Sequence, residues 1–228
     1  MDAQSIVLSV SLALLGVALA VVSARALAKF AATRSLPQAA WGAGLALGSA
    51  AMLVETLVYL GTVTVPLLQA YVFLSAAIVG VLSLGATRVL RRPRFEAAYA
   101  LLILAGCTVV GVASFTTPLS LSMVSEGVIV GNPPLVLLLL SSIVTVPATI
   151  VLLTSAAVSL RRSWRWQTML MVAGALVLGA GGTLYIASFP VALYYAEFIG
   201  IGLLFLGLMS LPASTAVPAP MGRPAASQ

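Results

Sequence analysis

The sequence contains no histidine and a single cysteine, Cys107. One cysteine cannot form an internal disulfide. The absence of imidazole and of a second thiolate also removes the usual ligands of zinc, haem and copper. The same absences exclude Ser–His and Cys–His catalysis. We therefore predict that the chain has no metal centre of these kinds and no cofactor, and that it is not an enzyme.

Charged residues are also scarce: they make up 7% of the 228 residues, whereas 61% of the residues are hydrophobic. A soluble globular domain carries roughly a quarter charged residues. Runs of about 20 apolar residues recur along the whole chain, and each is long enough to cross a bilayer as a helix. The composition therefore predicts an all-α membrane protein whose helices are embedded in the lipid bilayer.

The apolar runs predict a bundle of seven transmembrane helices in one domain, residues 1–212, followed by a cytoplasmic tail, 213–228. The tail is rich in Pro, Ala and Ser, and we expect it to be disordered. The first helix is expected to be retained, because the start of the chain has an acid and no base, unlike a secretory signal. The seven expected spans are 6–29, 37–61, 65–88, 96–115, 134–160, 166–188 and 190–211.

The basic residues follow the first, third and fifth spans and occur once more in the tail. They are Arg25, Lys29, Arg34, Arg88, Arg91, Arg92, Arg94, Arg161, Arg162, Arg165 and Arg223. With seven spans, all these segments lie on one side, and an excess of Lys and Arg marks the cytoplasmic side. We therefore predict a plasma-membrane protein with its N-terminus outside and its C-terminus in the cytoplasm. The basic residues that give the net charge of +6 then lie beside anionic lipid headgroups, so a nucleic-acid partner is not needed to explain this charge.

Two pairs of similar segments indicate an internal repeat. TLVYLGTVTVPLLQAY (56–71) is similar to TLYIASFPVALYY (183–195), and AVVSAR (20–25) is similar to AAVSLR (156–161). The first three spans would then match the last three in the same orientation, which predicts a parallel 3+1+3 repeat.

Seven helices with this orientation and repeat resemble, in topology, the microbial opsins and the SWEET-type transporters. The resemblance covers most of the chain but rests on no family motif. Opsins attach retinal to a lysine in the last helix, and the last span here, PVALYYAEFIGIGLLFLGLMSL, contains none. Lys29, at a cytoplasmic helix end, is the chain's one lysine, so covalently bound retinal is excluded.

Small residues recur four apart, as at Gly44 and Gly48 in the second span. This spacing lets helix backbones approach closely in lipid. We expect the close contacts to lie within one chain, and homo- or hetero-oligomerisation is the alternative.

Two acids lie inside apolar runs: Glu55 in AMLVETLVYLG (51–61) and Glu197 in YYAEFIGIG (194–202). At 1.5 Å per residue, Glu55 lies about 9 Å and Glu197 about 10 Å below the outer boundary of the membrane. An acid at that depth costs about 2–3 kcal/mol even on lenient insertion scales, so neither should face lipid. We expect both acids to face the interior of the bundle.

Tyr59, Tyr71 and Tyr195 are expected at a similar depth, where their hydroxyls can donate hydrogen bonds to the carboxylates. No Lys or Arg lies on this side to form an ion pair. Each carboxyl should then be protonated, share a proton with its partner, or bind a cation. The sequence thus predicts a site for a proton, small solute or cation that consists of Glu55, Glu197, Tyr59, Tyr71 and Tyr195.

Three readings of the acids stay open: a transport site, a protonated Glu that joins helices by hydrogen bonds, and a contact with another subunit. The first reading corresponds to a small-solute or proton/cation transporter. The other two correspond to an accessory subunit or sensor that transports nothing. The long outer connection, 116–134, is expected to lie against the membrane surface or to fold over the mouth of the bundle.

Overall fold

The computed structural model describes most of the first 162 residues and parts of the remainder. The described residues are 3–90, 92–125, 128–129, 133–162, 166, 169–170, 173–174, 176–177, 196, 199–203 and 206. Several predictions fall outside them and stay predictions: Glu197, Tyr195, most of the sixth and seventh spans, the repeated segment 183–195 and the tail 213–228.

Five long helices make up most of the described chain. They are α1 (Ala3–Thr33), α2 (Leu36–Tyr59), α3 (Val65–Thr87), α4 (Pro93–Thr116) and α5 (Leu135–Arg162). Each is long and apolar enough to cross a membrane. The first five predicted spans are therefore confirmed as helices, and the chain is a polytopic helical membrane protein.

The connections between the helices contain little regular structure. A short 3-10 turn, η1 (Arg88–Leu90), links α3 to α4. The longer link from α4 to α5 contains η2 (Leu121–Met123) and the strands β1 (Val124–Ser125) and β2 (Val128–Ile129). The two strands pair antiparallel, with Val124 opposite Ile129.

Local sequence explains where the helices begin and end. Prolines occupy the first turn of α2, α3 and α4, where the missing N–H is not needed. Gly61 has φ +89° after α2, and its N–H donates to the Val58 carbonyl while Thr62 N–H donates to that of Leu57. This Schellman motif requires a left-handed residue, which glycine adopts without strain.

α1 is longer than predicted: it ends at Thr33, four residues past the expected end at Lys29. Arg25 and Lys29 lie on the helix itself and are exposed. Alanine is frequent between 24 and 32, and alanine has the highest helix propensity, which explains the extension. The apolar stems of Arg and Lys also let the charged heads reach the membrane surface from within a helix.

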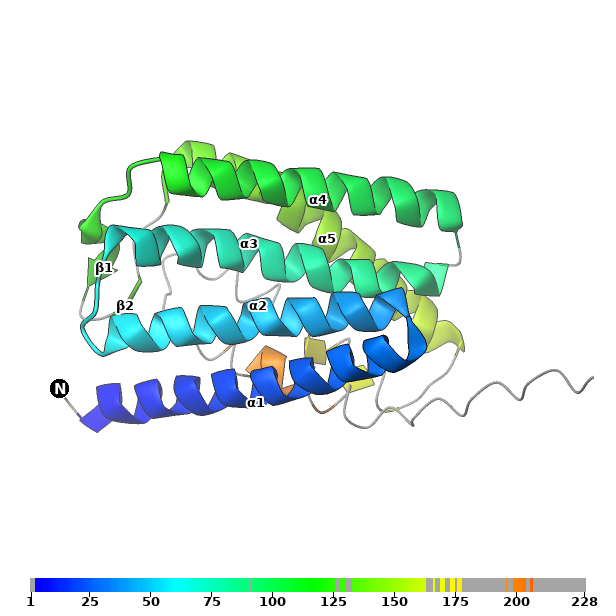
Figure 1. Ribbon diagram of the computed structural model, residues 1–228, viewed down its shortest axis with the longest axis horizontal. Coiled ribbons are helices and arrows are strands. Elements are labelled where there is room, and N and C mark those ends of the chain that lie inside the picture. Colours follow the sequence, from blue (N-terminus) through cyan, green and yellow to red (C-terminus); the bar gives the residue numbers. More distant parts are fainter. Residues whose placement is uncertain are drawn as a thin grey trace, which may run out of the picture.

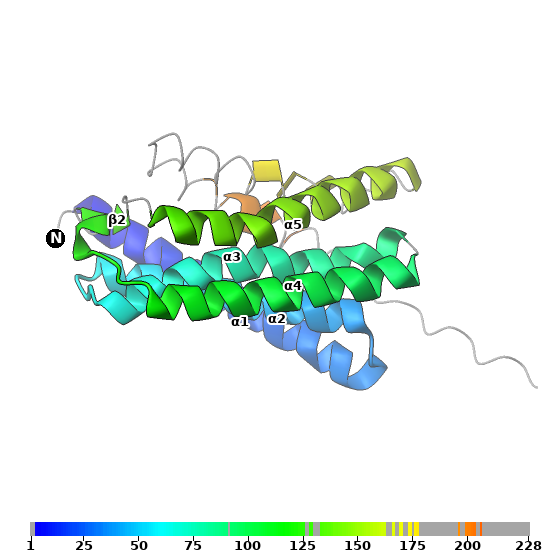
Figure 2. The ribbon, with the colours of Figure 1, turned by 90° about the horizontal axis from the view of Figure 1, so that it is seen from above.

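The helices form an antiparallel bundle in which α3 is central. α1 packs on α2, α2 on α3, and α3 on both α4 and α5, which also contact each other. Figure 1 shows α1 to α4 side by side in chain order, with α5 behind them. The perpendicular view in Figure 2 places α5 across one face of the α3–α4 pair.

Small residues and serines hold α1 against α2. Ser23 Oγ donates to the Gly42 carbonyl at 2.7 Å, and Ser49 Oγ donates to the Gly16 carbonyl at 2.8 Å. These two hydrogen bonds run in opposite directions between the helices, and each ends on a glycine carbonyl that a neighbouring helix can approach closely. The expectation of close contacts within the chain is met here.

The contacts between α2 and α3 define a register. The Trp41 ring lies against Gly85, and three residues later in α2 Gly44 lies against Leu82, three residues earlier in α3. Val58 lies fourteen residues after Gly44 in α2, and Leu68 lies fourteen residues before Leu82 in α3. Val58 and Leu68 belong to one buried cluster. A single antiparallel register therefore spans the length of the α2–α3 interface.

All described lysines and arginines lie at one end of the bundle, which we call the basic end. It contains the α1–α2 and α3–α4 connections and the end of α5, at the right of Figure 1. The members whose side chains are described are Arg25, Lys29, Arg34, Arg88, Arg92, Arg94 and Arg161. The start of α1, the α2–α3 turn and the β1–β2 hairpin lie at the opposite end.

Candidate functional site: a buried carboxyl far from the basic end

Glu55 is one of the most buried side chains of the described chain, with 1% of its surface exposed. It lies on α2, about one turn before the last helical residue, Tyr59. Met52 and Val58, its buried neighbours on the same helix, belong to two different hydrophobic clusters. The predicted inward direction of Glu55 is therefore confirmed.

The two clusters show which elements surround this part of α2. Met52 shares one buried cluster with Leu12 and Leu19 of α1. Val58 packs with Leu68 of α3 and Leu137 of α5. Because α2 carries both residues within two turns, the Glu55 carboxyl lies where the α1 side and the α3–α5 side of the bundle meet.

Tyr71 of α3 is at the level of Glu55. Val58 in α2 and Leu68 in α3 continue the register that the Trp41–Gly85 and Gly44–Leu82 contacts set. Glu55 lies three residues before Val58, and Tyr71 lies three residues after Leu68, so this register places Glu55 and Tyr71 at the same level. Tyr71 is buried, with 8% of its surface exposed. Two of the predicted site residues from different helices are thus at one depth in the bundle.

Tyr59 follows Glu55 by one helical turn, on the same side of α2, and is 8% exposed. It belongs to the α1-side cluster, which also contains Ile201. Ile201 lies in the helical stretch 199–203, close in sequence to the predicted site residue Glu197. The described part of the last predicted span therefore packs on the α1 side of the bundle, in a cluster that also contains Leu82 and so extends along α2.

The charge distribution leaves Glu55 far from the basic end. Nineteen residues of α2 separate it from Leu36, where the helix begins, so the two differ in level by about 28 Å. The other carboxylate among the described residues, Glu96, is in the first turn of α4 at the basic end. Among the described side chains, the buried acid Glu55 therefore lies in one half of the bundle, and the lysines and arginines lie in the other half.

The link between α4 and α5 covers the end of the bundle nearest to Glu55. Leu119, Met123 and Ile129 are buried in the cluster that contains Val58 and Tyr71. Gln69 Nε2 fixes the start of the link by donating to the Thr117 carbonyl at 3.2 Å. Of the two expected positions for this connection, the structure shows the fold over the bundle mouth.

A second polar contact inside the bundle was not anticipated from the sequence. Ser83 Oγ of α3 and Tyr99 OH of α4 are 2.6 Å apart, and both side chains are buried. The Tyr99 ring also stacks on Phe95, with ring centroids 5.6 Å apart. A buried tyrosine hydroxyl normally needs a partner. The feature of the sequence that could have predicted this contact is a serine and a tyrosine in consecutive spans.

Among the described residues, the predicted site offers the carboxyl of Glu55 and the phenol hydroxyls of Tyr59 and Tyr71. These groups bind and exchange protons, accept small cations, or hydrogen-bond a polar solute. Within the described residues, no three His, Cys, Asp or Glu side chains come together as a metal site. Comparison with protein-family models, curated proteins and solved structures found no match to this chain.

Proposed function

We propose that the chain is a seven-span plasma-membrane transporter, with its N-terminus outside, that moves protons, a small cation or a small solute. Glu55 is the group that binds the transported species, with Tyr59, Tyr71, Tyr195 and Glu197 completing the site. The observation that supports this proposal is a carboxyl with 1% exposure in a helix that is otherwise packed through apolar and small residues. Acids within membrane spans are costly and usually belong to substrate or proton pathways.

The orientation follows from the basic end. Lysines and arginines favour the cytoplasmic side, so the basic end faces the cytoplasm and Glu55 lies in the outer half of the membrane. The transported species would then reach Glu55 from outside, past the link that contains Leu119, Met123 and Ile129. The link's apolar contacts would have to open for this to happen.

A second candidate is a membrane protein that transports nothing, such as an accessory subunit or a sensor. The close packing of α1 on α2, with two serine-to-carbonyl hydrogen bonds, favours this candidate. In such a protein, the Glu55 carboxyl is protonated and joins helices by hydrogen bonding. The two candidates differ in whether Glu55 exchanges its proton with water during function.

Flux through reconstituted vesicles tests the proposal. The purified chain is placed in liposomes that contain a pH-sensitive dye, and proton flux is followed with sodium or potassium gradients. Glu55→Gln keeps the shape of the side chain but cannot release a proton. We expect it to lower the flux at least about tenfold, as when a proton-transferring group is removed.

Glu96→Gln is the matched control, because Glu96 is an acid at the basic end and outside the site. Its flux should equal that of the unchanged protein. If the unchanged protein carries no flux above empty liposomes, or if Glu55→Gln carries as much as Glu96→Gln, transport of protons or of proton-coupled cations through Glu55 is disproved.

A further inference from the structure

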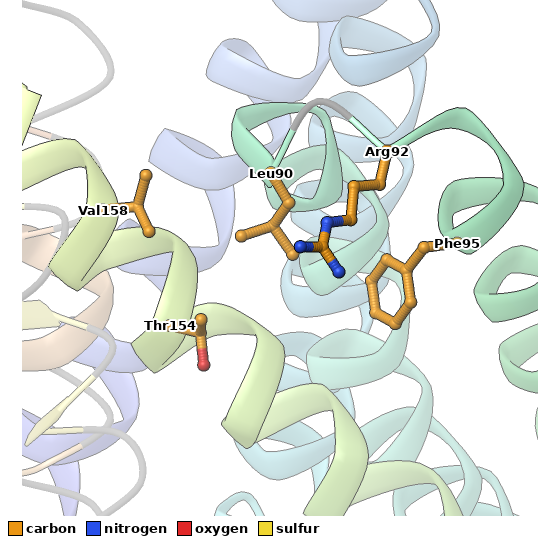
Figure 3. Close-up of a pocket in the computed structure, with 5 residues that line it drawn as sticks. All are labelled: Leu90, Arg92, Phe95, Thr154 and Val158. Atoms are coloured by element: carbon orange, nitrogen blue, oxygen red, sulfur yellow. The ribbon is translucent and has the colours of Figure 1, made fainter.

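A cavity of about 340 Å³ lies at the basic end, far from Glu55. It is bounded by η1, the start of α4 and the last turns of α5. Its lining consists of Leu90, Arg92, Phe95, Thr154 and Val158. Figure 3 shows the Arg92 guanidinium between the side chains of Leu90 and Phe95, directed toward α5. The cavity thus combines one cation with largely apolar walls.

The depth of the cavity matches the boundary between headgroups and acyl chains. Thr154 and Val158 precede Arg161, which lies at the end of α5, by seven and three residues. At the helical rise, they are about 10 Å and about 5 Å below the level of Arg161. A ligand held there would therefore have its charged part near Arg92 and its apolar part toward the membrane interior.

The surroundings favour a net negative ligand. Arg88, Arg94 and Arg161 are exposed at the same end of the bundle as Arg92. A guanidinium binds phosphate oxygens through paired, charge-assisted hydrogen bonds. The Thr154 hydroxyl already donates to the Ile150 carbonyl at 2.7 Å, so Arg92 is the main donor among the described lining residues.

The walls and the neighbouring surface favour a lipid over a free ion. A cavity of this size accommodates a headgroup and glycerol, at the small end of the range for ligand sites. Ile150 and Leu153 of α5, next to the cavity along the helix, are 59% and 37% exposed. Leu102 of α4 is 43% exposed, so apolar surface continues from the cavity along both helices. The acyl chains of a lipid can contact this apolar surface, whereas inorganic phosphate gains nothing from it.

We propose that this cavity is a binding site for one anionic phospholipid of the cytoplasmic leaflet. The phosphate binds Arg92, the glycerol contacts Phe95 and Val158, and the acyl chains follow α4 and α5 toward the membrane interior. This site differs from a general attraction of lipid to basic residues, because it assigns the affinity to one arginine among several. It depends on the membrane insertion of the bundle and not on transport through Glu55.

Lipid-binding titrations in detergent test the site. The full chain is titrated with phosphatidylglycerol, with phosphatidylcholine and with inorganic phosphate. Binding is read from the rise in the thermal unfolding midpoint and from the lipids retained in native mass spectrometry. We expect one tightly held phosphatidylglycerol, and a dissociation constant that rises at least about tenfold in Arg92→Gln, as for loss of a charge-assisted contact.

Two further variants separate the site from surface charge. Arg94→Gln removes an equal charge two residues away from Arg92, outside the lining, and should bind phosphatidylglycerol as the unchanged protein does. Val158→Phe fills the cavity without changing charge and should weaken binding as Arg92→Gln does. If Arg92→Gln and Arg94→Gln weaken phosphatidylglycerol binding equally, the binding is due to surface charge and the proposed site is wrong. An equal response to inorganic phosphate would show a free-anion site, and no preference for phosphatidylglycerol would disprove the proposal.

Discussion

Replacing Glu55 with methionine is expected to stabilise the protein while it abolishes transport. The carboxyl is 1% exposed, with the buried apolar residues Met52 and Val58 beside it on α2, and an acid in a membrane span costs about 2–3 kcal/mol on insertion scales. Methionine has a similar length, fits irregular apolar spaces and carries no polar group. Groups kept for function often lower the stability of a protein, so their replacement by a residue that fits the site is expected to raise it.

The measurement is the thermal unfolding midpoint of the purified protein in detergent. For a chain of this size, each kcal/mol moves the midpoint by about 2–4 °C, so we expect a rise of several degrees. Leu53→Met is the matched control. It introduces the same side chain two residues away, at a position that is 49% exposed, and should leave the midpoint unchanged. A lower midpoint for Glu55→Met would instead support a carboxyl that joins helices and transports nothing.

The second large effect is expected at Gly85, where α3 meets α2. A Cβ on Gly85 would overlap with Cδ1 and Nε1 of Trp41 and lie 3.0 Å from its Cε2. Gly85→Ala must therefore displace the indole ring or separate the helices. Overpacking of this kind typically costs about 1–3 kcal/mol, which lowers the unfolding midpoint by several degrees.

Gly48→Ala provides the comparison for Gly85→Ala. A Cβ at Gly48 lies 3.5 Å from Leu19 Cδ1, an ordinary contact. Both substitutions are glycine to alanine within a helix, so the gain in helix propensity is shared and the difference isolates the overlap with Trp41. Adding Trp41→Leu to Gly85→Ala should recover part of the loss. Equal midpoints for Gly85→Ala and Gly48→Ala would show that Trp41 does not pack on Gly85.

Much of the described fold follows from the sequence because the bilayer restricts the choices. A run of apolar residues in lipid must satisfy its own backbone hydrogen bonds, so it becomes a helix. The bounds of α2 and α3 fall within two residues of the predicted spans 37–61 and 65–88. α1 was predicted too short: it continues through an alanine-rich stretch to Thr33, four residues past the predicted end at Lys29. The count of seven spans and the 3+1+3 repeat stay predictions.

The partners of each helix could not be predicted in the same way. Gly44 and Gly48 look like one close-contact motif, but Gly44 packs against Leu82 of α3 and Gly48 against Leu19 of α1. In membrane helices every face is apolar, so the sequence pattern does not distinguish the side that meets lipid from the side that meets a neighbour. The cavity beside Arg92 and the Ser83–Tyr99 contact also depend on such pairings and were missed for that reason.

The candidate site was predictable in part. An acid such as Glu55 in an apolar run is visible in the sequence, and its cost in lipid predicts that it faces inward. The sequence also places Tyr59 on the same side of the helix, since the two residues are four apart. The level of Tyr71 depends on the register between α2 and α3, which the Trp41–Gly85 contact defines. Glu197 and Tyr195 lie outside the described residues and stay predictions.

The orientation of the bundle decides which side of the membrane reaches Glu55, and thiol labelling in intact cells measures it directly. Cys107→Ala removes the native thiol. Single cysteines are then introduced as Thr62→Cys in the α2–α3 turn and as Ala32→Cys at the basic end, both exposed positions. With a membrane-impermeant maleimide, Thr62→Cys should react in intact cells, and Ala32→Cys only after permeabilisation. Labelling of Ala32→Cys in intact cells with Thr62→Cys protected would invert the bundle, place Glu55 in the inner half and contradict the proposed site.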